Sequence, residues 1–148
     1  MVNDSLLDNR VLLASVLAWL IAQVSKTVGE IIKERRLVLS RLVSSGGMPS
    51  SHSALVTSLA TTTARIMGLG SPTFAVAAVL AGIVMYDAAG VRRAVSIQAR
   101  ILNQMIDEAF QGRPFAEKRL RELIGHTPTQ VFVGGVLGIC VGLVVTSY

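Results

Sequence analysis

Apolar residues gather in stretches long enough for helices, separated by short segments rich in glycine, serine and proline. The four apolar stretches are residues 11–25, 53–69, 72–86 and 127–148. A membrane crossing takes about 20 apolar residues, and only the last stretch, which contains no charged residue, reaches that length. The first and third have 15 residues each, so their flanking polar groups would extend toward the headgroups. The pattern predicts an all-α, polytopic membrane helical bundle with about four spans.

Residues 91–110 differ from these stretches because their apolar positions recur at helical spacing among charged and polar ones. The apolar positions are Val91, Ala94, Val95, Ile101, Leu102, Met105 and Ala109. Such a pattern is typical of helices that lie at a membrane surface. We expect an amphipathic interfacial helix here. Packing of its apolar stripe on the helical bundle is an equally good explanation.

The composition favours a membrane protein of one domain. The chain has 148 residues, of which 51% are hydrophobic and 16% are charged, against about a quarter charged in an average soluble domain. The apolar stretches occupy about half of the chain, which leaves too little polar surface to cover them in a soluble helical bundle. Residues 1–148 are therefore expected to form a single membrane-embedded domain. The single cysteine, Cys140, excludes a disulfide framework and a zinc site built from cysteines.

The basic residues indicate one side of the membrane. The net charge is +5, and 12 of the 14 Lys and Arg residues lie in two blocks, 26–41 and 92–121. Basic loops favour the cytoplasmic side, and one orientation satisfies both blocks, with both termini outside. Nucleic acid is not the expected partner, because only four Phe and two Tyr are present for stacking on bases. No signal peptide is expected, since Asp4 and Asp8 precede the first apolar stretch and no small-residue cleavage site follows it.

Three glycines in the last stretch form a ridge at four-residue spacing: Gly134, Gly138 and Gly142. Such ridges let helices approach closely within lipid. Packing inside one chain and a homo-oligomer through these glycines both use the ridge, and the sequence does not choose between them.

The chain has two histidines, His52 and His126, and each stands at the start of an apolar stretch, just after a basic block. Backbone N–H groups and serine hydroxyls at such helix starts bind phosphate. One neutral imidazole can then attack phosphorus, while the other, when protonated, gives its proton to the leaving oxygen. Lys and Arg would offset the charge of the transition state, so no metal and no cofactor is expected. The plainer alternative is that both histidines cap helices or pack at an interface.

Three segments resemble a known family. They are Gly47-Met48-Pro49-Ser50-Ser51-His52-Ser53-Ala54, Val84-Met85-Tyr86-Asp87-Ala88-Ala89-Gly90-Val91-Arg92-Arg93 and His126-Thr127-Pro128-Thr129-Gln130-Val131. Together they resemble the divergent branch of the type 2 phosphatidic acid phosphatases, which are related to vanadium haloperoxidases. The resemblance implies a metal-independent lipid-phosphate phosphatase on the cytoplasmic membrane face. Phosphatidic acid, phosphatidylglycerophosphate and isoprenoid diphosphates are the substrates it implies, with membrane lipids as partners.

The resemblance also implies roles for individual residues. His126 matches the nucleophile, which would form a phosphohistidine, and His52 matches the acid that protonates the leaving group. Ser50 and the backbone at Ser51 match phosphate contacts. Lys26 is the best match to a phosphate-binding lysine, although its spacing differs from that of the family.

Some positions depart from the family pattern. Lys33 stands where the family has arginine, and Leu120 stands where an arginine normally precedes the nucleophile. Arg121 is one residue too close to the nucleophile to match that arginine. The resemblance therefore leaves Arg92 or Arg93 to supply the positive charge.

Gln130 is the largest departure, because the family has aspartate at this position. A carboxylate there orients and stabilises the nucleophilic imidazole, whereas a glutamine oxygen accepts its N–H without adding charge. Slower turnover follows, unless Asp87 or Glu122 supplies the charge. For Asp87, near the end of a predicted span, a catalytic role and a salt bridge with a neighbouring arginine are equally good explanations. The alternative function is a non-catalytic membrane protein that binds anionic lipid or a partner through a degenerate site.

Overall fold

The computed structural model describes residues 8–34, 47–109 and 126–147, without the side chains of residues 30, 33, 34, 91–93, 107 and 108. Helices account for nearly all of the described residues, and no strand occurs among them. The helices are α1 (Arg10–Glu34), α2 (Ser51–Met67), α3 (Pro72–Ala89), α4 (Val91–Ala109) and α5 (Pro128–Val145). The all-α prediction is confirmed, and α1 continues well beyond the first apolar stretch.

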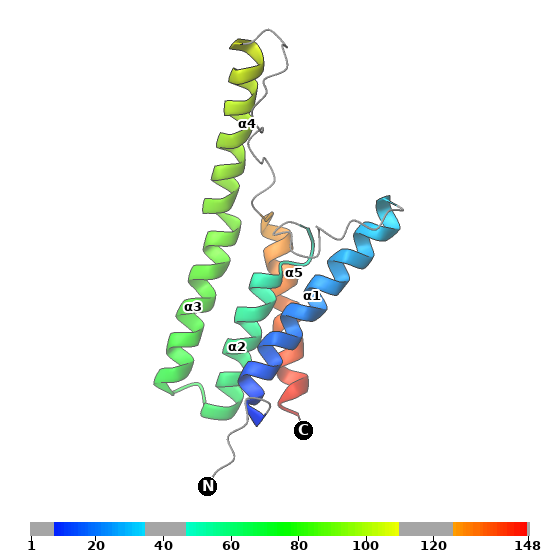
Figure 1. Cartoon of the computed structure of the whole chain (residues 1–148). Helices are drawn as coiled ribbons and strands as arrows, with labels where there is room; N and C mark the ends of the chain where they lie inside the picture. Colours follow the sequence, from blue (N-terminus) through cyan, green and yellow to red (C-terminus); the bar gives the residue numbers. More distant parts are fainter. Residues whose placement is uncertain (1–7, 35–46, 110–125, 148) are drawn as a thin grey trace.

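Local sequence signals set the turn between α2 and α3. α2 ends at Gly68, whose φ of 84° lies in the left-handed region that favours glycine. Ser71 then caps α3, because its hydroxyl accepts a hydrogen bond from the Phe74 N–H at 3.2 Å. Pro72 fits the first turn of a helix, where no N–H is needed. The short turn makes α2 and α3 antiparallel neighbours (Figure 1).

α2 is the central helix of the bundle. It packs against α1, α3 and α5, and α1 also packs against α5. α2 and α5 run in the same direction, so both begin at the end of the bundle where α3 finishes (Figure 1). α1 begins and α5 finishes at the opposite end. These directions agree with the alternation that the two basic blocks predict.

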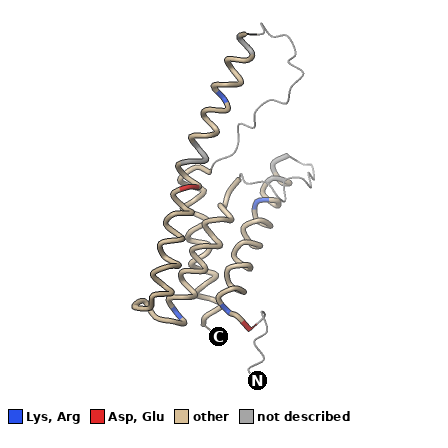
Figure 2. The backbone as a smooth tube through the Cα atoms, turned by 60° about the vertical axis from the view of Figure 1, so that its left-hand side comes forward, with Lys and Arg blue, Asp and Glu red and all other residues tan. Residues whose placement is uncertain are grey.

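Three helical segments of the described chain are long and apolar enough to cross a membrane. They are Arg10–Gly29, Pro72–Ile106 and Pro128–Val145. The described charged residues lie near the ends of the bundle and on α4, and the middle of the bundle is uncharged (Figure 2). The protein is therefore a membrane helical bundle. The remaining expected span, α2, has 17 residues, seven of them Ser or Thr, and lies among the other helices.

Small residues bring the helices together. Ala18 and Ala22 of α1 form a fully buried cluster with Ala54 of α2, and Leu137 and Val141 of α5 pack against it. Without a hydrophobic force between helices in lipid, close backbone approach supplies much of the association energy.

The glycine ridge of α5 is buried against α2. A Cβ atom at Gly134 would overlap the Ser50 carbonyl, and one at Gly138 would overlap the Ala54 carbonyl. Gly142 continues the same contact toward the end of α2. The ridge thus packs within the chain, and a homo-oligomer built through these glycines would require α5 to leave α2.

α4 continues from the end of α3 and extends beyond the bundle (Figure 1). Among the described helices it contacts α3 alone. Several of its large apolar side chains are exposed: Val95, Ile97, Ile101, Leu102 and Met105. Within the described residues, packing of α4 on the bundle is therefore limited to its contact with α3. A position at the membrane surface stays a prediction.

Candidate functional site

The starts of α2 and α5 meet at one end of the bundle. The backbone N–H of Ser50, the N-cap of α2, donates to the Gln130 carbonyl in the first turn of α5 at 3.0 Å. The backbone N–H of His126 donates to the Ala88 carbonyl, in the last turn of α3, at 3.2 Å. The starts of α2 and α5 and the end of α3 are thus held together by main-chain hydrogen bonds. Because two helix N-termini converge here, their dipoles make this end attractive to anions.

The two imidazoles lie close together at this meeting point. The ring centroids of His52 and His126 are 6.3 Å apart, and the ring planes are inclined by 60°. His126 is 2% exposed, whereas His52, in the first turn of α2, is half-buried. The nucleophile approaches phosphorus to about 3.3 Å and the acid binds the leaving oxygen on that phosphorus at about 2.9 Å, so two rings that share one phosphate must have their nitrogens within about 8 Å of each other. The spacing therefore suits one phosphorus centre between the two rings.

Gln130 holds the ring of His126 through its side-chain oxygen. The Thr127 backbone N–H donates to Gln130 Oε1 at 3.0 Å, and His126 Nδ1 lies 3.2 Å from the same oxygen. Thr127 in turn caps α5, so Thr127 and Gln130 form a reciprocal capping box. Since Oε1 only accepts hydrogen bonds, Nδ1 must carry a proton. In the neutral ring the lone pair is then on Nε2.

Lys26 of α1 reaches the same end of the bundle from the other side. Its Nζ donates to the Ser51 hydroxyl at 3.3 Å, and the lysine side chain is only 6% exposed. Ser51 is the first residue of α2 and directly precedes His52. The structure therefore brings the predicted lysine beside the histidine motif, although the two are distant in sequence.

Ser50 has a different immediate contact from the one that the family resemblance implies. Its hydroxyl accepts hydrogen bonds from the Ser53 N–H at 3.4 Å and from the Ser53 hydroxyl at 3.0 Å. It is fully buried, so its hydroxyl caps α2 and shapes the loop. A phosphate contact through this residue stays a prediction.

Asp87 stands one residue before Ala88 at the end of α3, and its side chain is half-buried. The structure thus puts it near the backbone that supports His126. The side chains of Arg92 and Arg93 lie outside the described part, so both explanations of Asp87 stay open. The side chains of Lys33, Leu120, Arg121 and Glu122, which the sequence analysis also names, lie outside the described part as well.

Comparison with known proteins shows the family of the chain. The model of the divergent PAP2 family, named after the type 2 phosphatidic acid phosphatases, matches residues 7–141. The chain belongs to the divergent PAP2 family. A Bacillus subtilis (strain 168) protein named "uncharacterized membrane protein YuiD" is 44% identical over 154 residues, which cover 97% of this chain and 98% of that protein. No solved structure matches the chain.

The sequence analysis does not predict two elements of this candidate site. The first is the capping role of Gln130, although the spacing Thr-x-x-Gln at Thr127 carries the signal of a capping box. The second is the Ala88 carbonyl, which binds the His126 backbone. A main-chain acceptor leaves no residue-type signal, so only the folded chain reveals it.

Proposed function

We propose that this divergent PAP2 protein is a metal-independent lipid-phosphate phosphatase that works through a phosphohistidine on His126. The observation that carries the proposal is the approach of the His52 and His126 rings at 6.3 Å, at the joined starts of two helices. Two histidines that only capped helices would not need to share one site. Substrates are phosphate monoesters or diphosphates of membrane lipids, such as phosphatidic acid, phosphatidylglycerophosphate or isoprenoid diphosphates.

In the first step, Nε2 of His126 attacks the phosphorus atom of the ester. A bond forms between Nε2 and phosphorus, and the bond between phosphorus and the lipid oxygen breaks. The His52 imidazolium gives its proton to that oxygen, so the lipid leaves as an alcohol. Gln130 keeps the His126 ring in the required tautomer because its oxygen accepts the Nδ1 proton.

In the second step, water replaces the lipid oxygen. His52, now neutral, takes a proton from the water as the water oxygen attacks phosphorus, and the bond between phosphorus and Nε2 breaks. Inorganic phosphate leaves and both histidines return to their starting states. The sum is hydrolysis of one phosphate ester by one water molecule.

The positive end of the bundle supports the charge of the transition state. Lys26 brings a buried ammonium group next to Ser51, and the first-turn N–H groups of α2 and α5 point out of the same end. Preorganised donors of this kind typically contribute about 100- to 1,000-fold to the rate.

A phosphatase assay on detergent-purified protein tests the proposal. Phosphate release from a panel of lipid phosphates should be inhibited by vanadate, resist chelators and vanish in His126→Ala and His52→Ala. Protein quenched with detergent at alkaline pH should carry a base-stable, acid-labile phosphoryl group that His126→Ala lacks. Activity that survives His126→Ala would overturn the assignment.

The second candidate is a non-catalytic protein that binds anionic lipid or a partner through the same cradle. Gln130 favours it, because no formal charge at this position stabilises the imidazolium of a phosphohistidine. Phosphate-dependent lipid binding without any phosphate release across the panel would support this function.

We also propose that the site faces the cytoplasm, since both basic blocks then satisfy the positive-inside bias. Ser147, exposed after the end of α5 and so at the opposite end, allows a test. In a Cys140→Ser background, Ser147→Cys should react with a membrane-impermeant maleimide on intact cells. Reaction only after the cells are opened would place the site outside.

A further inference from the structure

One face of α2 is left open by its neighbours. His52, Leu55 and Leu59 are half-buried rather than fully covered, and their spacing puts them on one side of the helix. The residues that α5 covers, such as Ala54 and Thr57, lie on the opposite side. We call His52, Leu55 and Leu59 the open strip.

The open strip lies between α1 and α3. Both of these helices pack on α2, yet within the described ranges they do not pack on each other. Because α5 occupies the far side of α2 and contacts both α1 and α3, the uncovered side is the one between α1 and α3. This strip therefore faces the surrounding lipid. His52 forms the end of the strip that lies at the histidine site.

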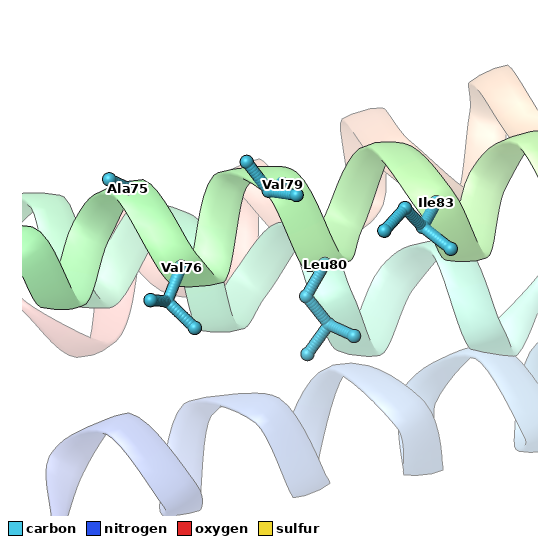
Figure 3. A pocket seen from close by; sticks show the side chains of 5 residues that line it. All are labelled: Ala75, Val76, Val79, Leu80 and Ile83. Atoms are coloured by element: carbon cyan, nitrogen blue, oxygen red, sulfur yellow. The ribbon is translucent and has the colours of Figure 1, made fainter.

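The exposed side of α3 is apolar, and Val76 and Leu80 form its edge toward α1. A hollow of about 420 Å³ is lined by Ala75, Val76, Val79, Leu80 and Ile83. Figure 3 shows Val76 and Leu80 directed toward the side of α3 on which α1 lies in that view. Continuing the stripe of Val76, Leu80 and Ile83 by one more helical turn leads to Asp87, at the site end of α3. The apolar surface thus runs along the bundle and stops at the polar site.

An apolar surface that ends at a polar, positively charged site suits a ligand with a hydrocarbon chain and an anionic head group. The polar end offers His52, His126 and the buried Lys26, which suit a phosphate, and the remainder of the surface offers only hydrocarbon contacts. From Val76 to Asp87, α3 rises about 17 Å, close to the hydrocarbon depth of one leaflet, about 15 Å. A lipid anchored by its phosphate would therefore align its chain with this surface without leaving its leaflet.

We propose that the open strip and the facing side of α3 bind a hydrocarbon chain of the lipid whose phosphate occupies the histidine site. The identity of the head group rests on the proposed function. The strip gives the protein lateral access to its substrate and makes it selective for long-chain phosphates over soluble phosphate esters.

Photolabelling tests the contact without requiring turnover. The full-length protein in nanodiscs is irradiated with phosphatidic acid that carries a diazirine in one acyl chain, and the labelled peptides are mapped. We expect labelling of Leu55 and Leu59 that unlabelled phosphatidic acid suppresses, and no such labelling with phosphatidylcholine bearing the same chain. Equal labelling by both lipids, or suppressible labelling on the outer face of α5, would overturn the proposal.

Substitutions in the strip give a second, kinetic test. Leu55→Trp and Leu59→Trp should each lower kcat/KM for long-chain phosphatidic acid by about tenfold or more, the scale of a misfit in an apolar pocket. The same variants should hydrolyse para-nitrophenyl phosphate at the wild-type rate. Val136→Trp on the exposed face of α5 is the matched control and should change neither. Equal losses of activity on both substrates, or no loss on either, would contradict the binding of a hydrocarbon chain by the open strip.

The two proposals fail in different ways. Head-group-dependent labelling of the strip in a protein that hydrolyses no lipid phosphate would leave the strip in place and refute the phosphatase. If His126→Ala abolishes hydrolysis and both strip variants keep the wild-type kcat/KM, the phosphatase stands and the open strip is refuted.

Discussion

His126 Nδ1 lies 3.2 Å from Gln130 Oε1, an oxygen that also accepts the Thr127 backbone N–H at 3.0 Å. The cap of α5 and the orientation of the imidazole therefore depend on one amide oxygen. The aspartate that the resemblance to type 2 phosphatidic acid phosphatases implies at this position would provide both orientation and charge, whereas Gln130 can provide orientation alone. This separates two contributions that are usually combined in a single carboxylate.

The first prediction concerns the tautomer of His126. With histidine labelled by nitrogen-15, the neutral ring should show a protonated Nδ1 and an unprotonated Nε2. Gln130→Leu removes the acceptor and should give a mixture of tautomers, while Gln130→Glu should retain the wild-type pattern. Since the chain has two histidines, His52→Ala assigns the signals. An unchanged pattern in Gln130→Leu would contradict the role given to the amide oxygen.

Charge at position 130 should raise the rate. Gln130→Glu keeps the reach of the side chain and replaces a neutral hydrogen bond by one to a carboxylate, which is stronger by about 1–1.5 kcal/mol. If that difference is realised in the transition state, kcat rises about tenfold. Steady-state hydrolysis of phosphatidic acid measures it, with Thr129→Glu, one residue away and exposed, as the charge control. A rate in Gln130→Glu no higher than that of the wild type would favour the binding protein.

Lys26 should act on turnover rather than on folding. Lys26→Met keeps an unbranched apolar stem in a buried position and should reduce kcat/KM by about 100-fold or more, as for loss of a transition-state donor. Arg65→Gln removes an exposed charge at the other end of α2 and should leave kcat/KM unchanged. Comparable losses in both variants would show that only the overall charge matters.

Two N-caps allow the loop of α2 to be tested separately from helix stability. Ser50→Ala and Ser71→Ala each remove a capping hydroxyl, at a cost of about 1 kcal/mol. Melting temperatures should fall by similar small amounts. Hydrolysis should fall in Ser50→Ala only, because that loop joins the start of α5 at Gln130. Equal activities in the two variants would refute a functional role for the loop.

Gly138→Ala should destabilise the bundle. Its Cβ would overlap the Ala54 carbonyl and the Thr57 hydroxyl, and overpacking of this kind costs about 1–3 kcal/mol. Gly82→Ala is the matched control, since its Cβ meets nothing within 4 Å, and alanine favours a helix over glycine. Thermal unfolding followed by size-exclusion chromatography should separate the two. A lower stability for Gly82→Ala than for Gly138→Ala would contradict this packing.

Much of the fold follows from the sequence because hydrophobicity marks helices of this kind directly. The turn at Gly68 and the proline of Pro72 appear in the sequence where the structure has them. The position of Lys26 does not follow, because its approach to Ser51 depends on how α1 crosses α2. Short-range spacing predicts which residues share a helix, and only packing decides which helices share a site.

The polar content of α2 has a consequence for how the protein enters the bilayer. With seven hydroxyl residues in 17, this helix alone is a poor candidate for release from the insertion machinery into bare lipid. Stable insertion of α2 in the bilayer therefore depends on the packing of α1 and α3 against it, which shields its hydroxyl groups from lipid. Mutations that weaken those contacts should therefore appear first as failed biogenesis and early proteolysis, before any defect in chemistry can be measured.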